Sequence, residues 1–119
     1  MARIDLTPNT KPTAYPTLPV SANGLDVAFE AADPTNKNQF APSGDDLVLV
    51  WNQDVGAQTV TLTSVADDLN RTGDISAYSV GVDEIAMIRV KSKGFLQTDG
   101  KIYLEASAAT VFFAVIPLV

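Results

Sequence analysis

The sequence contains no cysteine and no histidine. Without cysteine the chain has no disulfide, no thiolate nucleophile and no thiolate metal site. Without histidine it lacks the commonest general base and the commonest transition-metal ligand. Neither a G-x-G-x-x-G motif following a strand nor a G-x-x-x-x-G-K-[ST] motif occurs, so the usual phosphate-binding loops are missing. These absences weigh against an enzyme, and we expect no catalytic residue, no cofactor and no metal ion.

Long apolar runs and strong positive charge are lacking as well. No run approaches the ~20 apolar residues of a membrane helix, and the first five residues lack the apolar stretch of a secretory signal. The net charge is −6, from 8 basic and 14 acidic residues that are dispersed along the chain. This charge pattern is typical of a solvated surface. The one short basic group, 89–93, reads as the wet side of a strand end, so we expect neither nucleic acid nor a membrane as a partner.

Proline divides the chain of 119 residues into two parts. Pro8, Pro12, Pro16 and Pro19 exclude a helix and make a ladder-paired central strand unfavourable, because proline fixes φ and extends the preceding residue. We therefore expect an extended, Pro-rich N-terminal arm over residues 1–22 and a single β domain over residues 23–119. Apolar side chains on a stiff arm suit docking onto a surface. The expected docking residues are Ile4, Leu6, Tyr15, Leu18 and Val20.

The remainder of the chain alternates between short apolar runs and turns. Strands are predicted at 25–31, 47–52, 58–65, 75–80, 84–90, 101–106 and 110–119. Segment 84–90 also allows a helical turn, although its surroundings favour a strand, and 32–45 is predicted to be a long polar loop. Strands at this spacing with no clear helix predict an all-β fold, an antiparallel β-sandwich or jelly-roll-like barrel.

The last predicted strand is apolar on both faces. Val111, Phe113 and Val115 alternate with Phe112, Ala114 and Ile116, and successive side chains of a strand point to opposite sides of the sheet. One face can be covered by the core, and the other needs cover from outside it. The predicted core and subunit-interface residues are Phe112, Phe113, Val115 and Ile116, and the pattern favours a subunit of an assembly.

Other residues allow weaker hypotheses. The loop 67–74 offers three carboxylates that could bind Ca²⁺, but its spacing does not match the twelve-residue calcium loop. Asp45 and Asp46 could in principle form a glycosidase pair, although turn formation explains them better. Trp51 would suit sugar stacking only as an exposed flat face. A β-sandwich that binds a carbohydrate or a host-surface receptor is therefore the alternative function.

The order of several motifs resembles that of small tailed-bacteriophage head proteins. An A-A-D-x-x-N-x-N-x-F loop ends at Phe40, and an apolar strand ending in Asn52 follows it. Three further features follow in the expected order: the T-V-T-L-T ladder at 59–63, the polar loop at 71–75, and the 99–104 hairpin with its 107–109 link. The likeness covers roughly residues 23–119. The chain departs from the pattern at its apolar end, 116–119, where many relatives have a basic or polar stop.

The resemblance implies a capsid decoration protein, also called a cement protein, that stabilises the head. Such proteins resemble β-barrel or jelly-roll units, often trimeric, on the outer face of the capsid of the virion. The implied partners are further copies of the chain, a homotrimer first among them, and the major capsid protein. The implied location is the outer face of a capsid assembled in the host cytoplasm.

Overall fold

The computed structural model describes residues 2–11, 26–66 and 69–119. Within these residues the chain forms strands and no helix. The strands are β1 (Ile4–Asp5), β2 (Glu30–Ala31), β3 (Asn38–Phe40), β4 (Asp45–Asn52), β5 (Gln58–Leu62), β6 (Ile75–Val80), β7 (Ile85–Lys91), β8 (Ile102–Ala106) and β9 (Val111–Pro117).

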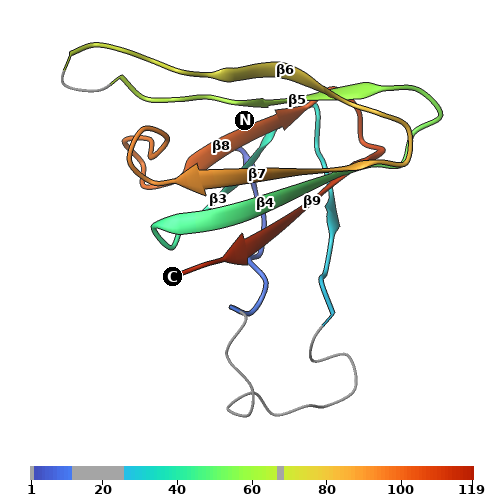
Figure 1. Ribbon diagram of the computed structural model, residues 1–119, viewed down its shortest axis with the longest axis horizontal. Helices are drawn as coiled ribbons and strands as arrows, with labels where there is room; N and C mark the ends of the chain where they lie inside the picture. Colours follow the sequence, from blue (N-terminus) through green and yellow to red (C-terminus); the bar gives the residue numbers. More distant parts are fainter. Residues whose placement is uncertain (1, 12–25, 67–68) are drawn as a thin grey trace.

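These strands form two sheets that pack face to face (Figure 1). The first sheet has the order β1-β3-β8-β5-β6, and the second has the order β2-β9-β4-β7. Among the described strands only β1 and β3 pair in parallel, and every other pair is antiparallel. The predicted all-β class is therefore confirmed, with an antiparallel second sheet and a first sheet that is antiparallel except for the β1–β3 pair.

The core lies between the sheets and follows the alternation of the strands. In β4 every second residue is buried, and in β9 Val111, Phe113 and Val115 are about 1% exposed. Because successive residues face opposite sides, one face of each strand builds the core. The largest fully buried side chains include Phe40, Val48, Val50, Val60, Leu62, Val90, Ile102, Leu104, Val111, Phe113 and Val115.

Most of the predicted strands are present, with changed bounds. The ambiguous segment at 84–90 is strand β7, and the predicted strand at 58–65 ends at Leu62. Only Glu30–Ala31 of the predicted strand at 25–31 pairs in a sheet. Two short strands were not predicted, because β1 lies in the expected arm and β3 lies in the expected polar loop. Both are recruited by tertiary pairing and have little alternation of their own.

The A-A-D-x-x-N-x-N-x-F motif has a structural role in the fold. The carboxylate of Asp33 accepts hydrogen bonds from the backbone N–H groups of Thr35 and Asn36, each at 3.0 Å. Asn38, which is fully buried, accepts a bond from the backbone N–H of Asp33 at 2.9 Å. Phe40 then enters the core at 0% exposure. The motif closes a turn between β2 and β3 through side chains that mimic backbone partners.

The first residues of the chain are bound to their own domain. The backbone N–H groups of Ile4 and Leu6 donate to the carbonyl oxygens of Lys37 and Gln39 at 2.9 and 2.8 Å. Leu6 is 5% exposed and belongs to the core, whereas Ile4 is 45% exposed. Arg3 lies 4.0 Å from the centre of the Tyr103 ring, a cation–π contact that fixes the segment further.

Glu105 connects this N-terminal segment to the first sheet. Its carboxylate binds Arg3 at 3.2 Å and Lys37 at 3.1 Å. Desolvation raises the pKa of Glu105, but the hydrogen bonds from Lys37 and Arg3 outweigh it and hold the pKa below its ordinary value of 4.5. Glu105 therefore stabilises the folded form above pH 4.5, and this contribution is lost as the pH falls through the lowered value.

Replacing Glu105 with glutamine is expected to loosen the N-terminal segment. Amide exchange at Ile4 and Leu6 should accelerate up to about fivefold, because a partly exposed ion pair contributes at most about 1 kcal/mol. Hydrogen–deuterium exchange at neutral pH measures this change. Acidifying the wild-type protein through the lowered pKa of Glu105 should reduce the protection factors of the same amides, after correction for the intrinsic pH dependence of exchange. The matched control is Glu84→Gln in the exposed turn before β7. Unchanged exchange at both amides in Glu105→Gln would contradict the role of this carboxylate.

Candidate functional site

The outer face of the second sheet carries a continuous set of apolar side chains. Leu47, Leu49 and Trp51 lie on the face of β4 opposite its buried residues. The register places each of them between one residue of β9 and one residue of β7. The three rows across the sheet are Ile116–Leu47–Arg89, Ala114–Leu49–Met87 and Phe112–Trp51–Ile85.

We call the eight apolar members of these rows the apolar grid: Leu47, Leu49, Trp51, Ile85, Met87, Phe112, Ala114 and Ile116. Exposure rises across it toward β7. Ala114 is buried, the other β4 and β9 members are half-buried, and Ile85 and Met87 are 51% and 73% exposed. An outward sheet face in a small antiparallel fold is normally polar, so the apolar grid is a candidate interaction surface, with Ile85 and Met87 as its exposed members.

An ion pair borders one end of the apolar grid. Arg89 binds the carboxylate of Asp45 through two nitrogens, with the Nε–Oδ1 distance at 3.0 Å. The hydrogen bonds from Arg89 lower the pKa of Asp45, and Lys91 contributes to the same shift. The grid thus has an apolar centre and a charged border, the usual anatomy of an interaction surface.

The four predicted core and interface residues fall into two pairs. Phe113 and Val115 are each 1% exposed and belong to the core. Phe112 and Ile116 are half-buried and lie on the apolar grid. The sequence did not single out Leu47, Leu49, Ile85 or Met87 as surface residues, although the doubly apolar pattern of 47–52 carries the same signal as that of β9.

The predicted docking residues are not brought together in the described part of the chain. Ile4 is on the surface beside β3, and Leu6 is buried in the core. Tyr15, Leu18 and Val20 lie outside the described residues. Their docking stays a prediction, and the boundary at residue 22 is not decided by the described residues.

Trp51 has neighbours on two sides. Its ring meets Phe29 edge to face with centroids 5.4 Å apart, and its Nε1–H donates to Asp83 at 3.3 Å. The side chain is half-buried within the apolar grid. Both neighbours therefore hold the indole ring in place.

The acidic side chains of these loops that the structure describes accept hydrogen bonds from nearby residues. Asp74 accepts bonds from the backbone and hydroxyl of Ser64, and these bonds lower the pKa of Asp74. Asp46 is 1% exposed and accepts two bonds from Ser43. In the part of the chain that the structure describes, no group of three or more acidic residues lies close enough to hold a metal ion.

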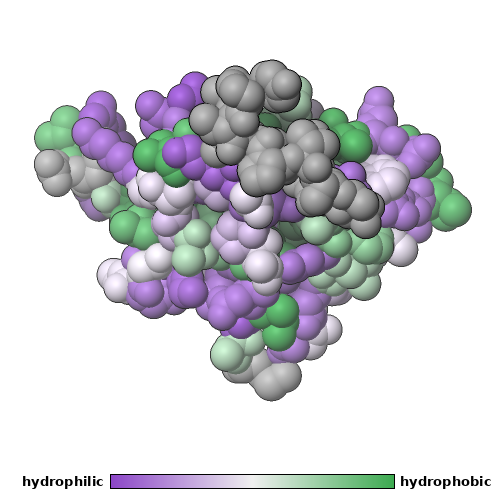
Figure 2. Space-filling view, turned by 90° about the horizontal axis from the view of Figure 1, so that it is seen from below, coloured by the Kyte–Doolittle hydropathy of each residue, from purple (hydrophilic) through white to green (hydrophobic). Residues whose placement is uncertain are grey.

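Seen from below in Figure 2, hydrophobic residues form separate clusters among hydrophilic ones. Within residues 2–11, 26–66 and 69–119, no helix is long and apolar enough to cross a membrane. No protein-family model matches the chain, and no significant match was found among curated proteins or solved structures.

Proposed function

We propose that the protein is a structural virion protein of a tailed bacteriophage, a capsid decoration protein that stabilises the head. It binds the outer face of the shell as a homo-oligomer, with a trimer as the expected form, and its second partner is the major capsid protein. The finer parts of the proposal are a jelly-roll-like barrel and an extended arm over residues 1–22. The order of motifs in the sequence supports this class.

The apolar grid is the observation that carries the proposal. Its members come from β4, β7 and β9, and the register makes them contiguous. A long-lived apolar surface of this kind is an aggregation hazard unless a specific partner covers it. A structural subunit has such a partner permanently, because its function is to remain associated. In the proposal, Phe112 and Ile116 contact neighbouring copies while Phe113 and Val115 support them from the core.

The size of the apolar grid fits the centre of an interface. Three strands about 4.8 Å apart, each contributing about five residues at about 3.4 Å, cover roughly 250 Å². A stable interface buries about 800 Å² on each partner. The grid thus supplies the apolar centre, and surrounding polar residues supply the border. Burial of each large apolar side chain contributes about 1.5–3 kcal/mol.

Binding to heads tests the function directly. Heads purified without the protein, from the phage whose genome encodes the chain, should release DNA at a higher temperature once the wild-type protein is added. Release is measured with a DNA-binding dye during heating. If the protein neither binds these heads nor changes the release temperature, the proposed function is wrong.

A triple variant tests the arm within the same assay. Replacing Tyr15, Leu18 and Val20 with serine should leave the β domain folded and weaken head binding about tenfold or more, because three apolar contacts are lost. Circular dichroism checks the fold, and the control is Val55→Ser, at a position 96% exposed in the turn after β4. Head binding equal to that of the wild type would remove the arm from the proposal.

A further inference from the structure

The two sheets end unevenly on one side of the sandwich. The first sheet has five strands and the second has four. In Figure 1 the β5–β6 hairpin lies above β7, past the edge of the second sheet. Tyr78 of β6 pairs with Val60, which is fully buried, so both side chains are on the core side of their sheet. Tyr78 is nevertheless 52% exposed, which indicates that the inner face of β6 lacks full cover.

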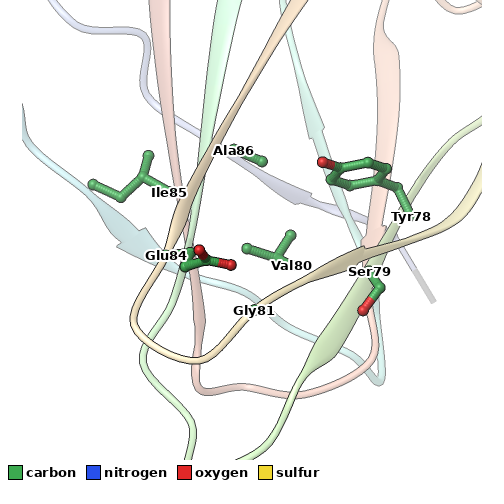
Figure 3. A pocket seen from close by; sticks show the side chains of 7 residues that line it. All are labelled: Tyr78, Ser79, Val80, Gly81, Glu84, Ile85 and Ala86. Atoms are coloured by element: carbon green, nitrogen blue, oxygen red, sulfur yellow. The ribbon is translucent and has the colours of Figure 1, made fainter.

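A groove follows this step between β6 and β7. Its larger section has a volume of about 420 Å³ and is lined by Ile75, Tyr78, Ala86, Met87, Ile88 and Arg89. A second section of about 200 Å³ continues past Tyr78 and Ala86 to the turn at Gly81 and Glu84. Figure 3 shows this second section, where Ile85 points away from Val80 and Tyr78.

Strand β7 is an edge strand whose protection is limited to charges at one end, Arg89 and Lys91. Proteins shield edges by making them short, by bulges, by proline or by charged side chains. β1 and β2 have two residues each, and β6 is irregular, with Ala77 at a φ of 48° and a register shift opposite it. β7 runs regularly over seven residues and contains neither proline nor glycine. It is therefore the edge best suited to pair with another strand.

The hydrogen-bond pattern shows which backbone groups of β7 face the groove. The N–H of Asn52 donates to the carbonyl of Glu84 at 3.0 Å, whereas the carbonyl of Asp45 accepts from Leu118 at 2.9 Å. The backbone groups of even-numbered residues in β4 thus form their hydrogen bonds with β7, and those of odd-numbered residues form theirs with β9. In an antiparallel ladder the bonding alternates along each strand. The N–H and C=O groups of Ile85, Met87 and Arg89 consequently point toward the groove.

We propose that this groove is the open position of a fifth strand in the second sheet, and that it binds an extended segment of another protein antiparallel to β7. Every second guest side chain is apolar, because it covers Tyr78 and Ile75. The charged residues near the groove determine which charge each end of the guest segment carries. Lys91 lies at one end of β7 beside the Arg89–Asp45 ion pair, and Asp83 and Glu84 precede the other end. An antiparallel guest therefore carries an acidic residue at its N-terminal end and a basic residue at its C-terminal end.

A second copy of the chain fits this position poorly. If the β7 strands of two copies paired antiparallel in one continuous sheet, a twofold axis perpendicular to that sheet would relate the copies. The first sheets of both copies would then lie on the same side of the continuous sheet. Because the β5–β6 hairpin lies past β7 in each copy, the two hairpins would meet in the same space (Figure 1). A single strand from a different protein avoids this clash.

A synthetic peptide tests the strand position. The probe is acetylated and amidated Glu-Val-Thr-Val-Thr-Val-Lys, labelled with a fluorophore, and binding is measured by fluorescence anisotropy on the full chain. Met87→Pro should weaken binding at least tenfold, because it removes one N–H that faces the groove. Met87→Ala keeps the N–H and controls for the loss of the Met87 side chain, so it should weaken binding clearly less than Met87→Pro does. Tyr78→Ala should weaken binding about tenfold through lost apolar contact.

The controls separate backbone pairing from other effects. Proline is tolerated on edge strands, and circular dichroism checks that Met87→Pro is folded. A peptide with glutamine at both ends should bind several-fold more weakly than the charged probe. Equal binding of the probe to the wild type and Met87→Pro, or no binding at millimolar peptide, overturns the proposal. Self-association that Met87→Pro abolishes and Met87→Ala leaves unchanged would assign the position to a second copy and overturn the choice of partner. The inference is independent of head binding, so the two can fail separately.

Discussion

Replacing Phe113 with alanine is expected to lower the free energy of unfolding by about 3–5 kcal/mol. Phe113 is 1% exposed at the centre of β9, where it pairs with Glu30 of β2 and Val50 of β4. Truncation loses the transfer free energy of the ring and leaves a cavity in a close-packed core. Since domains of this size are stable by only about 5–15 kcal/mol, the variant should lose a large share of its stability. Urea denaturation followed by tryptophan fluorescence measures the change.

The adjacent residue provides a matched control. Phe112 lies on the opposite face of the same strand and is half-buried on the apolar grid. Phe112→Ala removes the same side chain, but the expected loss of stability is less than half that of Phe113→Ala, because no enclosed cavity is formed. The comparison is made with a non-associating background such as Met87→Glu, so that assembly does not contribute. Equal losses in the two variants would contradict the assignment of core and outer faces in β9.

Met87→Glu is expected to abolish association through the apolar grid. Met87 is 73% exposed, so the substitution should leave the fold of the isolated chain intact. In an assembly that covers the grid, the new carboxylate would be buried beside Arg89, which is already bound to Asp45, at a cost of about 3 kcal/mol or more. Association should weaken more than a hundredfold. Sedimentation velocity should show the mass falling from the oligomer, expected to be a trimer, to a single chain.

Val55→Glu is the control for this charge change. Val55 is 96% exposed in the turn after β4 and lies outside the apolar grid. The Val55→Glu variant introduces the same carboxylate, so the mass of its species in solution should equal that of the wild type. A wild-type protein that remains a single chain at high micromolar concentration would remove the grid as an interface between copies. The same conclusion would follow if Met87→Glu sedimented with the same mass as the wild type.

The sequence was sufficient for the strands with a strong apolar pattern. β5 lies where clean alternation predicted it and β4 lies where a doubly apolar run predicted it, within a few residues, whereas only Glu30–Ala31 of the alternating segment 25–31 pairs in a sheet. From the doubly apolar character of 111–116 we also expect cover from outside the core on the second face of β9, and this expectation stays a prediction. The reason is physical, because period-two alternation follows directly from the geometry of a strand. The two short strands at Ile4–Asp5 and Asn38–Phe40 were not predicted, because their pairing partners lie far along the chain.

The roles of individual residues were harder to predict. Leu6 was expected on an arm, yet it lies in the core of its own domain because β1 joins the first sheet beside β3. Ile85 and Met87 belonged to the most ambiguous segment, and their place beside β4 depends on the order of strands. Periodicity assigns a residue to a face of its own strand. It does not tell which strand lies beside it or whether another layer covers that face.

By itself the sequence determined that this chain is an all-β protein without histidine or thiol chemistry, and that its last strand is apolar on both faces. Only the tertiary structure decided that β4, β7 and β9 combine their outer faces into one apolar grid. It also decided that the second sheet ends one strand short beside Tyr78. Local alternation is encoded residue by residue, whereas the neighbours of a strand depend on pairing between distant segments.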